Sequence, residues 1–173
     1  MFSHDSITLR KLERGDLKLL SELKQESWFV THHVTIVNNE DQERWFEKLD
    51  EHPHHPANLF IIAETVGAYG YSIPIGLFKL TSIDWINRQA DVAWDVFKIN
   101  RGQGFGSKLV KAGTSFAFEI LNLHRLNAEI LETNKASMKY AIAAGYKQEG
   151  CKKAAIFKRD RYVDSHIYGC INH

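Results

Sequence analysis

The sequence predicts a mixed α/β sandwich of helices around one sheet, and three observations lead to it. Segments of alternating apolar residues are interspersed with segments of helical periodicity along the whole chain. Between Ala90 and Leu131 a strand, a glycine-rich turn, a helix and a strand follow one another, which predicts a βαβ unit with one parallel pair. A length of 173 residues, 44% hydrophobic and 25% charged, fits a single domain over residues 1–173.

The first part of the chain alternates strand and helix signals. An alternation of apolar and polar residues predicts a strand over Ile7–Leu12. Asp16 is a typical helix-start residue, and leucines recur after it on one helical face. Asn39 has the character of a cap for a second helix, which carries Trp45 and its apolar neighbours. Between these helices, Trp28–Val37 is aromatic and β-branched and has no clear helical period.

The rest of the chain supplies most of the sheet. Short apolar or alternating segments predict three central strands: Leu59–Ala63, Ile75–Ile83 and Ala90–Phe97. Apolar residues at helical spacing predict a helix after the glycine turn, and Leu126–Leu131 predicts the next strand. Lys135–Ala144 reads as a short helix that Gly145 terminates. Two further strands, Tyr146–Lys158 and Tyr162–Ile171, are expected to form the last hairpin.

Composition and charge argue against several classes of protein. The net charge of +1 gives no broad electrostatic signal for nucleic acid or an anionic membrane. No apolar run approaches the ~18 residues of a membrane span, and the polar N-terminus lacks a signal-peptide core, so we expect a cytoplasmic protein. Cys151 and Cys170 have no zinc spacing and predict free thiols. The histidines of segment 52–55 lie in a proline-broken loop without a second ligand cluster, and no metal is expected.

The glycine-rich turn at residues 101–106, Arg-Gly-Gln-Gly-Phe-Gly, predicts a phosphate site. Glycines let backbone N–H groups converge on one point, and the N-terminus of the following helix adds partial positive charge. Arg101 and Lys108 bring fixed charge, and Ser107 can donate a hydroxyl. The Rossmann fingerprint differs in spacing and stands earlier in its fold, and the Walker A spacing is missing. A tight structural turn that binds nothing remains an alternative.

Two motifs resemble those of the GNAT superfamily of acetyltransferases. Arg101, Gly104 and Gly106 match the pattern R/Q-x-x-G-x-G/A, which is similar to the pyrophosphate loop of that family. Further on, Asn134 followed by an apolar helix and a Gly-Tyr pair at 145–146 resembles a later family motif. The resemblance implies the GNAT acyl-CoA N-acyltransferase fold, an α/β (α+β) fold with a central, mostly antiparallel sheet that is flanked by helices and has one parallel strand pair splayed to admit CoA. It also implies an N-acetyltransferase that uses acetyl-CoA as co-substrate.

Within the superfamily, the chain resembles the branch of ribosomal-protein N-terminal alanine, spermidine and pseudaminic-pathway aminosugar acetyltransferases. The opening Ile7–Arg10 with Asp16, the segment Gln42–Phe46, and Gly150 followed by a long hairpin suggest this branch. A nucleotide-linked aminosugar ranks first as acceptor, then a protein N-terminus. A polyamine ranks last, because segments 28–38 and 81–90 hold one acid between them. The oligomeric state stays open, a homodimer included, and a catalytically weak acyl-CoA-binding sensor is the alternative function.

The resemblance also implies site residues. Those expected to bind the co-substrate are Asp95, Val96, Phe97, Arg101, Gly102, Gln103, Gly104, Phe105, Gly106, Ser107, Asn134 and Ser137. A β-bulge near Val96 is usual in this strand of the family. Those expected to line the acceptor pocket are Trp28, Phe29, His32, His33, Trp85, Tyr162 and Asp164.

Proton transfer is less well specified by the sequence. Asp91 is the first candidate base, acting directly or through a water, and Asp95 would share its strand face. Solvated carboxylates, or partners for Arg88, are the structural alternative. His32, like its neighbour at position 33, is a competing base with a suitable imidazole pKa. Many family members place a tyrosine seven residues after the asparagine as the general acid, and this chain has Ala141 at that position. Tyr140 lies one residue earlier and is either the acid or a core aromatic, in which case Ser137 or water serves.

Overall fold

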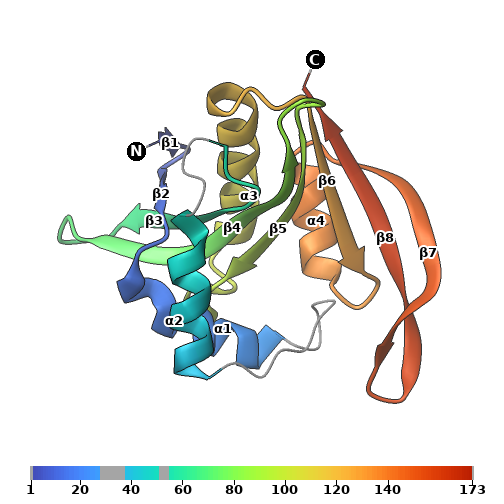
Figure 1. The fold of residues 1–173 in the computed structure, drawn as a ribbon, viewed down its shortest axis with the longest axis horizontal. Coiled ribbons are helices and arrows are strands. Elements are labelled where there is room, and N and C mark those ends of the chain that lie inside the picture. Colours follow the sequence, from blue (N-terminus) through green and yellow to red (C-terminus); the bar gives the residue numbers. More distant parts are fainter. Residues whose placement is uncertain (1, 28–37, 51–54, 173) are drawn as a thin grey trace.

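One eight-stranded sheet organises the structure, a computed structural model that describes residues 2–27, 38–50 and 55–172 (Figure 1). Its strand order is β1-β2-β3-β4-β5-β6-β8-β7. The strands are β1 (Phe2–His4), β2 (Ile7–Lys11), β3 (Leu59–Val66), β4 (Ser72–Asp84), β5 (Gln89–Val96), β6 (Arg125–Leu131), β7 (Lys147–Lys158) and β8 (Arg161–Ile171). All neighbouring strands pair antiparallel except β5 and β6, which are parallel. The predicted mixed sheet with one parallel pair is therefore confirmed.

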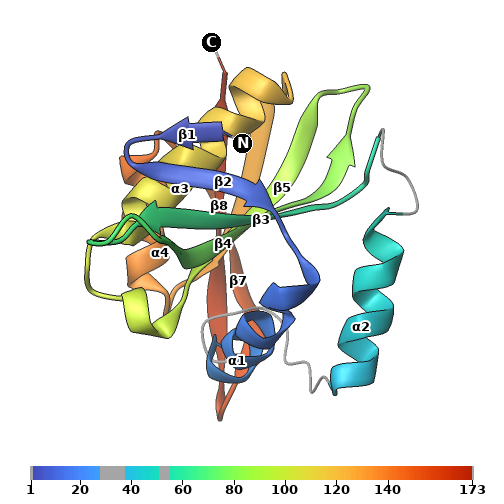
Figure 2. The ribbon, with the colours of Figure 1, turned by 90° about the vertical axis from the view of Figure 1, so that its left-hand side faces the viewer.

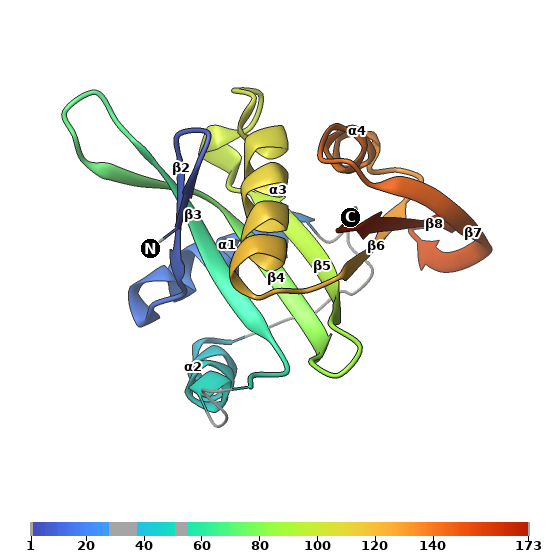
Figure 3. The ribbon, with the colours of Figure 1, turned by 90° about the horizontal axis from the view of Figure 1, so that it is seen from above.

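Helices cover both faces of this sheet. They are α1 (Leu17–Ser27), α2 (Asn39–Glu47), α3 (Phe105–Ser115) and α4 (Lys135–Ala143). Figures 2 and 3 show α2 and α3 on opposite sides of the central strands. Because side chains alternate along a strand, Phe78 packs beneath α3 while its neighbour Leu77 packs with α1 and α2. No helix in the described part of the chain is long and apolar enough to cross a membrane.

The N-terminal elements differ from the prediction in detail. Strand β1 was not expected, and the helix expected at Asp16 begins one residue later, after a 3-10 turn over Arg14–Asp16. Asn38, not Asn39, caps α2, because its backbone is extended and its side chain accepts the Asp41 N–H at 2.8 Å. Beyond Ser115, α3 continues into a π-helical turn that carries Phe116–Ile120.

Strands β5 and β6 diverge soon after they meet. Their ladder holds three residue pairs and ends at Asp91 and Asn127. Beyond that point β5 remains bonded to β4 and β6 to β8, so a wedge opens between them (Figure 1). This confirms the predicted splay. The pairing of β5 with β4 is continuous from Asp91 to Val96, and the register shift lies between Thr81 and Asp84, so the expected bulge near Val96 is not present.

A buried charge network ties the first strand to the sheet. Arg10 donates to both carboxylate oxygens of Asp16 at 2.7 and 2.9 Å and to Glu64 at 2.7 Å. Ser72 donates to Glu64, and the Glu13 N–H donates to Asp16. Burial alone would raise the pKa of Asp16, but the hydrogen bonds from Arg10 and Glu13 lower it below its ordinary value. Arg10 and Asp16 belong to the opening sequence motif that suggests a branch of the superfamily. Their contact is a structural ion pair, which we call the clamp.

Replacement of this arginine tests the clamp. Arg10→Met leaves Asp16 and Glu64 buried without their cation, so we expect a loss of about 3 kcal/mol in the free energy of unfolding, measured with urea. Arg14→Met removes an exposed pair with Glu43 and should cost below about 1 kcal/mol. An equal loss for both variants would contradict the assignment.

The same clamp predicts a pH dependence. Because the folded-state pKa of Asp16 is depressed, its stabilisation is fully present above its ordinary value of 3.8. It is lost as the pH falls through the lower, folded-state value. We therefore expect the wild-type chain to lose more stability than Arg10→Met as the pH falls below that ordinary value, measured by urea unfolding at each pH.

Candidate active site

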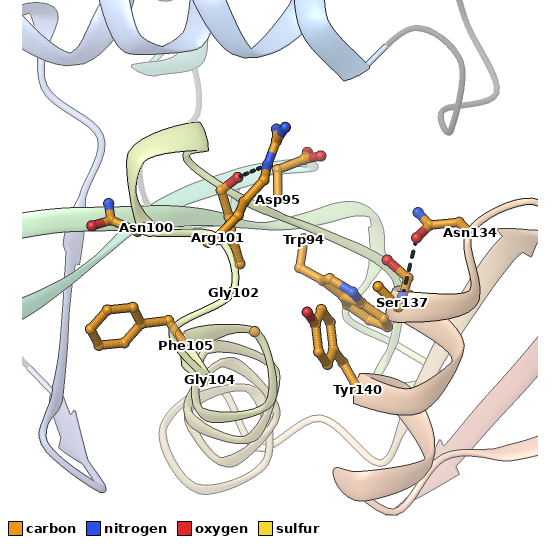
Figure 4. Close-up of a pocket in the computed structure, with 13 residues that line it drawn as sticks. Trp94, Asp95, Asn100, Arg101, Gly102, Gly104, Phe105, Asn134, Ser137 and Tyr140 are labelled. Carbon is orange, nitrogen blue, oxygen red and sulfur yellow. Dashed lines mark hydrogen bonds between the residues drawn. The ribbon is translucent and has the colours of Figure 1, made fainter.

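The mouth of the wedge between β5 and β6 forms a pocket with the N-termini of α3 and α4 (Figure 4). Thirteen residues line it: Trp94, Asp95, Val96, Asn100, Arg101, Gly102, Gly104, Phe105, Gly106, Asn134, Ala136, Ser137 and Tyr140. Most residues expected to bind the co-substrate therefore converge on one place.

The glycine turn presents backbone to this pocket. Gly102 and Gly104 have φ of +77° and +81°, a left-handed conformation that other side chains rarely adopt. A Cβ added to either would meet nothing within 4 Å, so conformation, not crowding, requires glycine there. Gly104 is the N-cap residue of α3, whose first N–H groups point out of the helix end. These groups form a cradle suited to an anion.

Gly106 is a glycine for a different reason. A Cβ at this position would lie 2.3 Å from the ring of Tyr140, so the tyrosine packs directly on the first turn of α3. Figure 4 shows the Tyr140 ring between the glycine turn and α4, with its hydroxyl toward the pocket. Tyr140 thus packs against the core, as one of the two interpretations expected, and also lines the pocket.

The backbone of β5 turns polar groups into the wedge. Phe97 donates its N–H to Ile75 of the neighbouring segment at 2.9 Å, which continues the β4–β5 ladder. In an antiparallel ladder alternate residues face the partner strand, so Trp94 and Val96 direct their N–H and C=O groups to the other side. That side is the wedge, because β6 has already separated. The Val96 carbonyl accepts a bond there from Arg101 Nε at 3.0 Å.

Three expected binding residues lie outside the pocket lining. Phe97 is buried beside α1 and α2, Gln103 Nε2 donates to the Ile99 carbonyl at 2.9 Å, and Ser107 lies further along α3. Figure 4 shows the Arg101 guanidinium pointing away from Gly104, toward the side where Asp95 lies. Arg101 thus shapes the turn through its bond to β5, while backbone N–H groups form the anion cradle.

Asn134 prepares the opposite wall. Its Oδ1 accepts the Ser137 N–H at 3.1 Å and caps α4, as predicted. The other half of the amide carries two donors, and no described residue accepts a hydrogen bond from them. Asn134 can therefore hold a ligand carbonyl across the wedge from β5.

Sequence reasoning missed three lining residues, Trp94, Asn100 and Ala136. Trp94 stacks near Phe78 and meets the Tyr146 ring edge-on, with centroids 6.5 and 5.8 Å apart. The strict alternation of β5 would have placed it on the α3 face. Asn100 is buried and bonded to the Pro74 carbonyl at 3.0 Å, which no local pattern signals.

The two aspartates of β5 share a face but differ in surroundings. Asp91 is exposed at the vertex of the wedge, and its carboxylate forms no hydrogen bond or ion pair with a described residue. Asp95 is 15% exposed, and Lys79 Nζ lies 2.9 Å from its Oδ2. The alternative partner, Arg88, forms no ion pair with either of them among the described residues.

Of the other residues expected at the acceptor side, some lie in the described part of the chain and some do not. His32 and its neighbours in segment 28–37 lie outside the described residues. Trp85 donates from Nε1 to the Pro56 carbonyl at 3.1 Å. Tyr162 meets Phe157 edge-on at 5.3 Å near the tip of the last hairpin. Asp164 accepts the Ala154 N–H at 2.9 Å and holds an irregular part of β7.

The cysteines lie on the last two strands of the sheet. Cys151 and Cys170 are free, as predicted, and they are not paired in the ladder, since each faces another residue. In the described ranges no three His, Cys, Asp or Glu side chains are grouped to hold a metal ion.

Known proteins share this arrangement. The family model of the acetyltransferase (GNAT) domain matches residues 6–147. The chain is 27% identical to spermidine N(1)-acetyltransferase of Vibrio cholerae over 165 residues, which cover 93% of this chain and 90% of that protein. It is 28% identical to the ribosomal-protein-serine acetyltransferase of Escherichia coli over 97 residues, 56% of this chain and 54% of the other. A crystal structure of the Vibrio cholerae spermidine N-acetyltransferase with CoA and spermine matches with a TM-score of 0.86 at 25% identity, covering 97% and 96% of the two chains.

Proposed function

This chain belongs to the GNAT acetyltransferase family, and we propose that it transfers acetyl from acetyl-CoA to a primary amine by direct attack on the thioester. The observation that carries the proposal is the open wedge between β5 and β6, with an anion cradle at its mouth. At its vertex stands the Asp91 carboxylate, which has no hydrogen-bond or ion-pair partner among the described residues.

The pocket residues suit the successive parts of acetyl-CoA, from the pyrophosphate at the mouth of the wedge to the thioester near its vertex. The pyrophosphate suits the N–H groups at the start of α3, where Gly102 and Gly104 leave open space. The pantetheine amides suit the β5 backbone at Trp94 and Val96, with the Asn134 amide opposite. The thioester would then point toward the vertex and Asp91.

Asp91 is the base that this arrangement favours. The incoming amine must lose a proton as its nitrogen bonds to the acetyl carbon, and an unpaired carboxylate can accept that proton directly or through a water. Asp95 is less suited to act as the base because its carboxylate already forms an ion pair with Lys79. His32 stays the second candidate from the sequence.

Tyr140 is the candidate acid. When the carbon–sulfur bond breaks, the CoA thiolate leaves and takes up a proton. The Tyr140 ring lies over Gly106 with its hydroxyl toward the pocket, between the cradle and the asparagine cap. Ala141, at the position where the family often has the tyrosine, is fully buried. Ser137 or water is the alternative donor.

The class of amine that accepts the acetyl group can be identified by an assay with several kinds of amine. Relatives named for spermidine or for a ribosomal protein do not support the ranking of a nucleotide-linked aminosugar first. Release of free CoA from acetyl-CoA, followed with DTNB, should exceed background with at least one of spermidine, an N-terminal peptide or an aminosugar nucleotide. Release from none of a broad amine panel, with acetyl-CoA binding intact, would favour the sensor alternative.

Gly104 tests the cradle. Gly104→Asp places a carboxylate where the pyrophosphate belongs, and we expect it to abolish the thermal stabilisation by acetyl-CoA. Gly104→Asn is the matched control, because asparagine has nearly the same shape and also tolerates a left-handed backbone. It should keep more of the stabilisation. Unchanged stabilisation of the aspartate variant would refute the assignment of this loop.

Asp91→Asn tests the base. Loss of a general base should lower kcat/KM by about 10²–10⁴-fold, with the deficit shrinking at high pH because more of the amine is already neutral. Asp160→Asn, at an exposed turn far along the last hairpin, is the control and should stay near wild type. A deficit below threefold at neutral pH would return His32 to first place.

Tyr140→Phe tests the acid. The variant keeps the ring that packs on Gly106 but removes the hydroxyl, so acetyl-CoA binding should stay near wild type while kcat falls by about 10²-fold. A kcat within twofold of wild type would assign the proton to Ser137 or water.

A further inference from the structure

A lysine that the proposed chemistry does not use lies beside the reaction path. Lys79 stands on β4 opposite Ala93 of β5, on the sheet face that also carries Asp91 and Asp95. Its Nζ is 2.9 Å from Asp95 Oδ2, and its side chain is 27% exposed. The ammonium is thus fixed by one carboxylate and still open on another side.

A second lysine reaches the same region from α1. Lys24 is half-buried, and its Nζ lies 5.3 Å from the centre of the Trp45 ring. The Trp45 ring meets the Phe60 ring edge-on at 4.8 Å, and Phe60 is the register partner of Lys79 on β4, so the two lysines lie in one region. Burial lowers the pKa of Lys24, and the positive charge of Lys79 lowers it further. Lys24 forms no ion pair with a described residue.

Among the described residues, Asp95 is the carboxylate that pairs with Lys79, and none pairs with Lys24. The two lysines therefore supply two positive charges against this one paired carboxylate. Lys79 stands opposite Ala93, midway between Asp91 and Asp95 in the strand register, and its ammonium pairs with Asp95. The carboxylate of Asp91, at the vertex, forms no ion pair with this lysine.

We propose that the acceptor amine carries an anionic group, a carboxylate or a phosphate, and that Lys79 recognises it with Lys24 in support. The inference rests on the proposed function, because it concerns the acceptor of the same transfer. The amine would lie at Asp91 and the anion toward Lys79, so that both charges of the acceptor meet their opposites. A polyamine would instead place a second ammonium against the lysines.

Matched acceptors test the proposal without depending on turnover. We would titrate the protein saturated with CoA by calorimetry, using lysine against cadaverine for a carboxylate and phosphoethanolamine against ethanolamine for a phosphate. The anionic member of at least one pair should bind about tenfold more tightly, as expected for a charge-assisted contact. The pair that responds identifies the anion. No preference in either pair, or tighter binding of spermidine than of every anionic amine, would overturn the proposal.

Variants separate recognition from structural support. Lys79→Met should remove the preference and raise KM for the anionic acceptor about tenfold, with kcat and the KM for acetyl-CoA near wild type. Lys79→Arg should restore most of the preference, and Lys111→Met, on exposed α3 surface, should change nothing. If Lys79→Met weakens both members of a pair equally, the lysine is structural and the proposal fails.

Two further outcomes are distinguishable. If Lys79→Met does not fold, Lys24→Met must lower the preference at least threefold for the proposal to stand. If no amine releases CoA while the binding preference is present, the proposed transfer fails but the recognition of an anionic amine by Lys79 holds.

Discussion

The short parallel ladder between β5 and β6 is the constraint on which the rest of the site depends. A strand that loses its partner in mid-course leaves backbone N–H and C=O groups without bonds, and such groups are costly unless another molecule satisfies them. Here the gap opens beyond Asp91 and Asn127 and runs to the N-termini of α3 and α4. An extended, amide-containing molecule with a terminal anion is the ligand that such a gap accommodates.

The two faces of β5 have different surroundings. Trp94 points into the core beneath α3, beside Phe78 and Tyr146. This packing anchors β5 to the core at the point where β6 separates from it. Asp91 and Asp95 point to the other face, where α1 and Lys79 contribute charge. Because the backbone between the faces borders the wedge, a thioester held there is accessible to an amine arriving from the charged side.

Packing also explains why the tyrosine of α4 stands one residue away from its usual place in the family. Ala141 is completely buried in the main core cluster, so a larger side chain at that position would have to displace its neighbours. The glycine at position 106 creates a flat surface on α3, and the ring of Tyr140 fills it. A local shift of the aromatic residue is thus compensated by a missing Cβ on the facing helix.

The sequence by itself determined the order of the helices and strands from β2 onward, the parallel pair, the glycine turn and the asparagine cap, because each depends on periodicity or on backbone preferences of a few adjacent residues. It placed Asp91 and Asp95 on one face for the same reason. Only the tertiary structure decided that Lys79 forms an ion pair with Asp95, while Asp91 has no partner among the described residues. It also decided that Arg101 donates to the Val96 carbonyl and that Trp94 and Asn100 line the pocket. These contacts join residues brought together by strand register and by the chain's return to the sheet, and no local pattern carries that information.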